Sequence, residues 1–262
     1  MTVSLSFDAS VYTPGTRHRA HQHDSLHLSL VLSGRVAETV GRNTEYASAL
    51  SVVAKDAGVT HADDFGSEGA KLARLTLPSG TIAALVDDPS RSSGWRWTHD
   101  DRVANPFLQL VRRANAGVFS FDIGDPDLID LLAALTARAA PLPRGGPPAW
   151  LDETMRELRE SWKPGLTVTE LARRAGVHPV YLARSVRRWF GTGVAEELRR
   201  LRIRSAAAAL TETTQTVSRV AHAGGFADEP HLCREFHRAM GMTPRRYRVL
   251  VAGLGRNCGG RS

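Results

Sequence analysis

Between Thr167 and Arg248 the sequence repeats one pattern that leaves few choices of fold. Each copy predicts a helix of about eight residues, a turn that contains glycine, and a second helix with basic residues at its exposed positions. The two copies are joined by Val194–Thr211, which has no helix breaker and predicts a connecting helix of roughly 27 Å. The segment therefore predicts a small all-helical domain. The paired helices are expected over 168–175 and 179–190 in the first copy, and over 217–223 and 229–240 in the second.

The ends of the helices in the first copy are marked by residues with known capping preferences. Thr167 is placed to cap the first helix, and Glu170 stands where it would complete a capping box. Gly176 can supply the left-handed residue that follows that helix. Pro179 suits the first turn of the next helix, which we expect to end at Gly191. These signals predict the boundaries of both helices.

Two helices joined in this way form a helix-turn-helix unit, whose second helix enters the major groove of DNA. Two units on one rigid connector can enter successive major grooves, which repeat about every 34 Å along one face of the duplex. Arg184 is suited to bidentate binding of guanine O6 and N7. For any one arginine, a solvated helix surface and a phosphate contact are the alternatives. The candidate DNA-contacting residues are Val180, Tyr181, Ala183, Arg184, Arg187, Arg188, Glu229, His231, Arg234 and Arg246, whereas Leu182, Val186, Trp189, Leu232 and Phe236 are expected to face inward.

The formal charge of +7 is distributed unevenly along the chain. Residues 1–150 carry 14 Lys/Arg against 16 Asp/Glu, a net of −2, whereas residues 151–262 carry 20 against 11, a net of +9. A basic module attached to a near-neutral one is typical of nucleic-acid binding, because phosphate neutralisation supplies most non-specific affinity. Arginine enrichment by a GC-rich genome is the alternative origin of the charge. The helix pattern favours DNA binding.

Five stretches of this segment keep one common register: TVTELA at 167–172, YLAR at 181–184, GGFAD at 224–228, REF at 234–236 and GMTPRRYR at 241–248. In these stretches the chain resembles the AraC family of bacterial transcription regulators. The chain departs from the family pattern at Glu229, Pro230 and His237. The resemblance implies a seven-helix DNA-binding domain and an N-terminal domain that senses an effector or dimerises. The partners it implies are double-stranded promoter DNA, RNA polymerase, a small-molecule effector and, as a candidate, a second copy of the chain.

The N-terminal half has a different composition and period. From Val3 to about Phe121, short alternating runs separated by turn signals predict strands of a small antiparallel barrel or sandwich. Asp127–Ala139 then predicts a helix, and the prolines of Pro141–Pro148 predict an extended linker. The fold class is therefore α+β. We expect a sensory domain at 1–124, a helix and linker at 125–151, the double helix-turn-helix domain at 152–250 and a flexible tail at 251–262, with Leu128, Leu131, Leu132 and Leu135 on one helix face as a candidate dimer contact.

Four histidines in this half have the spacing of a known β-barrel motif. Gly15, His21, His23, His27 and Gly34 match the spacing of the first cupin motif, with His27 where that motif has glutamate, and His61 stands in a partial second motif. The resemblance implies a cupin-like barrel in which His21, His23, His27 and His61 converge. Such an all-nitrogen set suits a divalent transition metal such as zinc, nickel, copper or iron(II). The alternative is that these histidines pack the barrel or contact an effector without metal.

The remaining features bound the function. Cys233 and Cys258 form neither a disulfide framework nor a zinc ribbon, and the sequence has no secretory leader or membrane-spanning run, so we expect a cytoplasmic protein with no membrane partner. Trp95, Trp97 and Phe107 are candidates either for a pocket lining or for the core. A cupin-type dioxygenase or isomerase fused to a DNA-binding module is the contrasting hypothesis, supported by the histidines alone. An architectural DNA-binding protein is disfavoured, because two base-reading helices imply site selection. We expect no enzymatic activity, since the sequence has no P-loop or nucleophile elbow.

Overall fold

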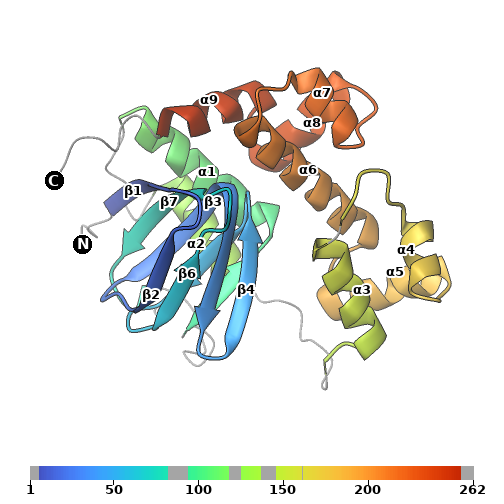
Figure 1. Ribbon diagram of the computed structural model, residues 1–262, viewed down its shortest axis with the longest axis horizontal. Helices are drawn as coiled ribbons and strands as arrows, with labels where there is room; N and C mark the ends of the chain where they lie inside the picture. Colours follow the sequence, from blue (N-terminus) through green and yellow to red (C-terminus); the bar gives the residue numbers. More distant parts are fainter. Residues whose placement is uncertain (1–5, 82–93, 118–124, 137–145, 161, 255–262) are drawn as a thin grey trace.

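In the computed structural model, the N-terminal half of the chain is an antiparallel sheet and the C-terminal half is helical (Figure 1). The structure describes residues 6–81, 94–117, 125–136, 146–160 and 162–254. The described strands all pair antiparallel, as the turn signals predicted. They are β1 (Ser6–Tyr12), β2 (Arg17–His21), β3 (Leu26–Val40), β4 (Asn43–Ser48), β5 (Val52–Lys55), β6 (His61–Asp64), β7 (Ala70–Leu77) and β8 (Trp95–Thr98).

The long strand β3 holds the sheet together, because each half of it belongs to a different set of strands. Its first half lies between β7 and β5 in the order β1-β7-β3-β5-β8, and its second half pairs with β4 and β6, which in turn pairs with β2. Among the described residues no ladder joins the outer strands, so the sheet does not close, and the closed barrel that was expected is not seen. The short strand β8 leads directly into a helix, which ends the sheet at that edge.

The stretch after β8 is helical, although the region up to about Phe121 was expected to form strands. Helix α1 (Asp101–Asn115) begins at Asp100, whose side chain accepts a hydrogen bond from the backbone N–H of Arg102. Its apolar residues recur every three or four positions and are buried. The spacing of Val103, Phe107, Leu110 and Ala114 already indicates a helix, so the expectation of strands overlooked a local period.

Helix α2 (Pro126–Thr136) packs on α1, and the four leucines of its predicted inward face, Leu128, Leu131, Leu132 and Leu135, are all buried. Asp125 caps α2 by accepting from the backbone N–H groups of Asp127 and Leu128. The leucine face therefore packs within the same chain and is not free to join two copies. The predicted linker falls largely outside the described residues, as does the end of the helix predicted to reach Ala139.

The helical half follows the predicted pattern closely. Thr167 accepts from the N–H of Glu170, and Gly176 and Gly191 follow their helices with φ of +66° and +68°. The capping box is only half formed, because the Glu170 carboxylate accepts from Arg173 and Arg174 instead of turning back to the cap. The helices are α3 (Ala149–Glu160), α4 (Val168–Arg174), α5 (Pro179–Phe190), α6 (Val194–Glu212), α7 (Val217–Ala223), α8 (Glu229–Met240) and α9 (Pro244–Leu254).

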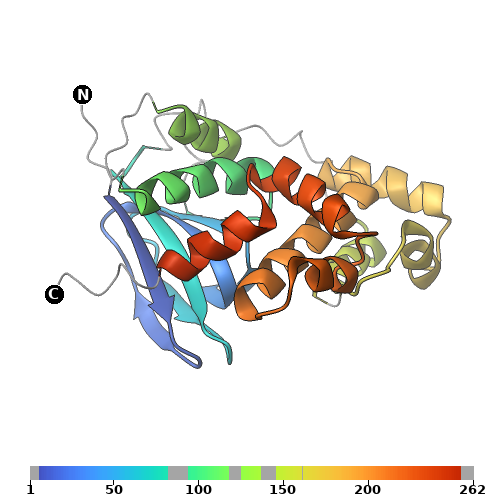
Figure 2. The same cartoon turned by 90° about the horizontal axis from the view of Figure 1, so that it is seen from above.

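Two hydrophobic cores meet along α6. The first joins the sheet, α1 and α2 to the C-terminal half of α6 and to α7, α8 and α9. The second joins α3, α4 and α5 to the N-terminal half of α6. The second helix-turn-helix unit, α7–α8, thus shares its core with the sheet, while the first unit, α4–α5, lies at the far end of α6 (Figure 1). Seen from above, α1 and α9 lie across the end of the sheet (Figure 2).

Polar contacts fix this arrangement where the helices meet β3. The fully buried Tyr247 of α9 donates its hydroxyl to the carbonyl of Leu32 at 2.6 Å. Glu212, at the end of α6, accepts from the N–H of Gly34 at 3.0 Å. Two side chains of the sheet half reach helical carbonyls: Lys71 bonds to Val251 at 3.2 Å and Gln109 bonds to Met240 at 3.1 Å. The second unit is therefore held to the sheet by directional bonds as well as by burial.

We expect Tyr247→Phe to destabilise the protein by about 1–3 kcal/mol, because it leaves the buried Leu32 carbonyl without its donor. Urea unfolding monitored by circular dichroism measures the loss. The matched control is Tyr46→Phe, since Tyr46 is 71% exposed and should lose its hydroxyl without effect. Equal stability of Tyr247→Phe and the wild type would show that the hydrogen bond does not contribute to holding α9 on the sheet.

Candidate nucleic-acid interface and histidine cluster

Helix α5 presents a mixed apolar and basic surface to solvent. Leu182 and Val186 are buried as predicted, and Trp189 is half-buried against the same core. Val180 and Tyr181 are 58% and 54% exposed, so both side chains are accessible to a partner. Of the other candidates on this helix, Arg184, Arg187 and Arg188 are exposed and Ala183 is half-buried.

One neighbour outside α5 restrains its exposed tyrosine. The ring of Trp150, on α3, stacks on Tyr181 with centroids 5.6 Å apart and planes 24° apart. Because the stacked ring has fewer rotamers available, the hydroxyl of Tyr181 is held in a narrower range of positions. This contact was not predicted from the sequence, because Trp150 lies outside both repeats of the helix pattern.

Helix α8 presents fewer free side chains than α5. Leu232 and Phe236 are fully buried as predicted, and Arg234 is exposed with no partner among the described residues. Glu229 lies 3.7 Å from the guanidinium of Arg245. His231 is engaged in the turn before the helix, where its Nδ1 accepts from the N–H of Ala227 at 3.3 Å. Arg234 is therefore the candidate of this helix that is most available to DNA.

Arg246 lies in the first turn of α9, a helix that follows the two predicted units. Its backbone N–H bonds to the hydroxyl of Thr243 at 3.4 Å, and its side chain is exposed. Helix α9 continues because its apolar residues Leu250, Val251 and Leu254 bury against the shared core. Arg246 is thus on a rigid helix that packs on the sheet.

Three of the four predicted metal-binding histidines come together. Ring nitrogens of His21, His23 and His61 lie within 4.8 Å of one another. His21 pairs directly with His61 across β2 and β6, which is how the partial second motif reaches the first. His27 lies on β3 and is not part of that group, although its ring centroid is 4.1 Å from that of His23. His23 lies after the end of β2 and before β3, so the alternation of side chains along a strand does not set its direction.

The hydrogen bonds of two of these rings leave one nitrogen available in each. Nδ1 of His21 is 2.9 Å from the carbonyl of Arg19, and Nδ1 of His61 is 3.0 Å from that of Val59. A ring that donates from Nδ1 to a carbonyl keeps a lone pair on Nε2, which is the arrangement of metal-ligating histidines. Nε2 of His61 and Nδ1 of His27 are buried and have no hydrogen-bond partner. The donor set is therefore chemically suited to a metal ion.

The structure adds three residues that sequence reasoning missed. Oδ2 of Asp63 lies 3.6 Å from Nδ1 of His18 and 3.9 Å from Nε2 of His61. Asp63 belongs to two further candidate metal-binding groups, one with His18 and His21 and the other with Glu38 and His61. His18 reaches the cluster because the register of β2 shifts between His18 and His21. Such an irregularity changes the face on which a side chain lies, and no sequence signal marked it.

The aromatic candidates have three different environments. Trp97 lines a cavity of about 10 Å³ that also touches Glu38, Lys55 and Arg74. Trp95 donates to the buried Glu38 carboxylate at 2.5 Å, on which Lys55 also forms an ion pair at 2.5 Å. Phe107 belongs to the core beneath α1. The cavity has room for about one water molecule and is too small for an organic ligand.

Burial favours the neutral form of His23, His27 and His61. It lowers the pKa of His23 to about 4 and that of His27 to about 3, and neighbouring cationic groups act in the same direction. The pKa of His61 is also lowered, chiefly by burial. Neutral imidazoles are the form that binds a metal. The cluster can therefore offer lone pairs at neutral pH.

The fold and the exposed basic helices define a protein with a paired helix-turn-helix unit. A family model described as a helix-turn-helix domain matches residues 171–249. The HTH-type transcriptional regulator GlxA of Rhizobium meliloti is 36% identical over 76 residues, 29% of this chain and 24% of that protein. A protein of Streptomyces lividans described as an AraC-like transcription regulator is 38% identical over 93 residues, 36% of this chain and 29% of that one. The C-terminal part of the chain is an AraC-type helix-turn-helix domain, which confirms the resemblance found in the sequence.

The chain spans less than a third of the length of these curated relatives. Among solved structures, the DNA-binding domain of AdpA in complex with a target DNA is 27% identical, with 42% of this chain and 97% of that one covered and a TM-score of 0.37. ToxT from Vibrio cholerae is 11% identical, with 94% and 98% covered and a TM-score of 0.37. These TM-scores are too low to establish a common fold. Within the described part of the chain, no helix is long and apolar enough to cross a membrane.

We expect the metal-free protein to lose stability as the pH falls below about 6.5, because unfolded histidines take up protons there while His23 and His27 stay neutral in the fold. The stability that these neutral rings contribute is fully present above pH 6.5. It is lost as the pH falls toward the folded-state pKa values, about 4 for His23 and about 3 for His27. Urea unfolding between pH 7.5 and 4.5 measures the slope. A His23→Gln/His27→Gln variant should show a shallower slope, and an unchanged slope would contradict the assignment.

Proposed function

We propose that this protein is a sequence-specific DNA-binding transcription regulator. The observation that carries the proposal is the pair of helix-turn-helix units on one continuous α6, each with exposed arginine on its second helix. A connector of this kind fixes the separation of α5 and α8, so that both can enter successive major grooves. Because the relatives' names describe transcription regulators, regulation is the role that their similarity supports for this chain.

We further propose the division into a cupin-like sensory domain at 1–124, a helix and linker at 125–151, the DNA-binding domain at 152–250 and a tail at 251–262. An effector acting on the sheet would influence DNA binding through the contacts that join β3 to α6 and α9. The second unit is the one that would respond, since it shares its core with the sheet.

A divalent transition metal is proposed for the histidine cluster of His21, His23, His27 and His61. The two rings that donate from Nδ1 and the buried, unpartnered nitrogens support it. His21, His23 and His61 would bind the ion directly, because their nitrogens already lie within 4.8 Å of one another. A bound ion would join β2, β6 and the turn before β3, so its role is structural or sensory.

The contrasting hypothesis is a cupin-type dioxygenase or isomerase fused to the DNA-binding module. The clustered histidines with Asp63 nearby favour it. The cavity beside them counts against it, because about 10 Å³ does not hold an organic substrate. Regulation remains the better-supported function, and no enzymatic activity is proposed.

The further partners that we propose are promoter DNA, RNA polymerase and a small-molecule effector, and the proposed location is the cytoplasm, where these partners meet. A homodimer is also proposed, but the leucine face of α2 is buried against α1 and cannot supply its interface. A dimer would have to use another surface.

We expect Arg184→Ala to relax the sequence preference at one base pair, and Arg246→Ala to weaken binding to all sequences alike. Arg184 is exposed on the recognition helix α5, where a bidentate contact with guanine provides about 1–3 kcal/mol of discrimination. Arg246 is exposed on α9, outside both recognition helices. Binding selections on randomised duplexes with the full chain measure both effects. If Arg184→Ala keeps the wild-type preference, its role in base readout is wrong.

We expect full-length protein purified without an affinity tag to bind about one equivalent of a transition metal. His21→Ala/His23→Ala should abolish this binding, because it removes two of the three clustered nitrogens. Elemental analysis after reconstitution and desalting gives the occupancy, and a chelator at neutral pH should remove the ion. Unchanged occupancy in the double variant, or less than about 0.1 equivalents in the wild type, would reject the site.

A further inference from the structure

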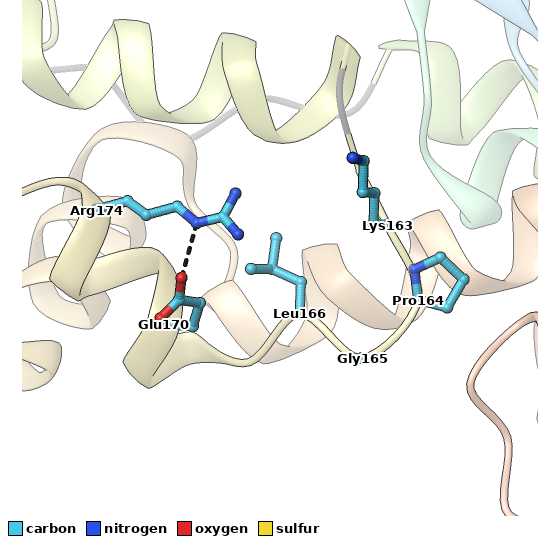
Figure 3. Close-up of a pocket in the computed structure, with 6 residues that line it drawn as sticks. All are labelled: Lys163, Pro164, Gly165, Leu166, Glu170 and Arg174. Carbon is cyan, nitrogen blue, oxygen red and sulfur yellow. Dashed lines mark hydrogen bonds and ion pairs between the residues drawn. The ribbon is translucent and has the colours of Figure 1, made fainter.

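A pocket with a cationic lining lies where the first helix-turn-helix unit begins. It has a volume of about 260 Å³ between the end of α3 and the start of α4 (Figure 3). Figure 3 shows Lys163 and Arg174 on either side of Leu166, with Glu170 bonded to Arg174. The lining residues are Lys163, Pro164, Gly165, Leu166, Glu170 and Arg174.

The single carboxylate in the pocket, that of Glu170, is already paired with two guanidinium groups. Glu170 accepts from Nε and Nη2 of Arg173 at 2.8 and 2.9 Å, and from Nε of Arg174 at 3.0 Å. These hydrogen bonds lower the pKa of Glu170 to about 2, so its charge is used to hold the two guanidinium groups. The terminal nitrogens of Arg174 remain available, and among the described residues the ammonium of Lys163 has no acceptor. The pocket therefore offers donors to an anion.

The pocket also lies at the junction of the two units. A Cβ atom on Gly225, in the turn between α7 and α8, would be 3.4 Å from the backbone nitrogen of Gly165 and 3.7 Å from Cβ of Pro164. The segment that lines the pocket is thus in contact with the turn of the second unit. If α5 and α8 enter successive major grooves, the minor groove lies between these two helices. The phosphate backbones that border this minor groove would then face the junction of the two units.

We propose that this pocket seats one phosphate group of the DNA backbone between the two half-sites, with Lys163 and Arg174 as its ligands. The inference rests on the proposed DNA-binding function and adds a contact outside both recognition helices. Such a contact fixes the position of the protein on the duplex and carries no sequence information. Glu170 is a positioning residue, because it orients the guanidinium of Arg174.

The test compares full-length wild type, Lys163→Gln and Arg42→Gln in DNA binding at several salt concentrations. Arg42 is an exposed arginine in the turn between β3 and β4 and serves as the matched charge control. Loss of one phosphate contact should make the slope of log K against log salt less steep by about 0.9. The affinity advantage of wild type over Lys163→Gln should therefore shrink about threefold between 50 and 200 mM salt. The loss should be equal on operator and random duplexes, and Arg42→Gln should behave as wild type.

A double-mutant cycle with Arg174→Gln shows whether both residues bind the same phosphate. The combined loss should then be smaller than the sum of the single losses. The thermal midpoint of Lys163→Gln should equal that of wild type because its side chain is exposed, and that of Arg174→Gln should fall only slightly because it loses one exposed ion pair with Glu170. A midpoint that falls in parallel with the binding loss would overturn the inference, because the loss would then come from unfolding.

Three outcomes would overturn the inference and differ from one another. Wild-type binding by Lys163→Gln would reject the pocket and leave the proposed function standing. No binding of wild type to any duplex would reject the proposed function itself. Saturable binding of inorganic phosphate at constant ionic strength, lost in Lys163→Gln while DNA binding is unchanged, would assign the pocket to a free phosphate.

Discussion

The burial of α6 and α9 against β3 is the interaction on which the arrangement of this protein depends. The C-terminal half of α6 contributes to a core that contains the sheet, whereas its N-terminal half contributes to the core of α3–α5. One helix therefore belongs to two cores, and the two helix-turn-helix units are not equivalent. The second unit cannot move relative to the sheet without opening the larger core, while the first is attached to the sheet mainly through the length of α6.

Polar bonds make this attachment specific. Apolar contacts alone would allow α9 to slide along the sheet, but the Tyr247 hydroxyl and the Glu212 carboxylate each bind one backbone group of β3. Both bonds lie at the end of the segment of β3 that pairs with β7, where the register shifts between Val31 and Ser33, just before the segment that pairs with β4. A change in the curvature of the sheet at this stretch of β3 would therefore act first on the end of α6 and on α9.

The histidine cluster and the basic pocket show two opposite ways of holding polar groups. In the sheet, burial disfavours the charged imidazole and leaves lone pairs without partners, which suits a cation. At the start of α4, exposed guanidinium groups are held by one carboxylate and keep spare donors, which suits an anion. In both places the chemistry depends on a second layer of partners: backbone carbonyls for His21 and His61, and Glu170 for Arg174.

The sequence by itself determined the helices, their caps and the faces of α5 and α8, because these depend on local spacing and on side chains within one turn of each other. It also predicted His21, His23, His27 and His61 as one group, of which His21, His23 and His61 come together. Only the tertiary structure decided that the sheet stays open, that the leucines of α2 pack on α1, and that His18 and Asp63 join the cluster while His27 stands apart from it. These outcomes depend on strand register, on a shift within β2 and on which surface covers which, and such long-range pairings leave no periodic signal in the residues that make them.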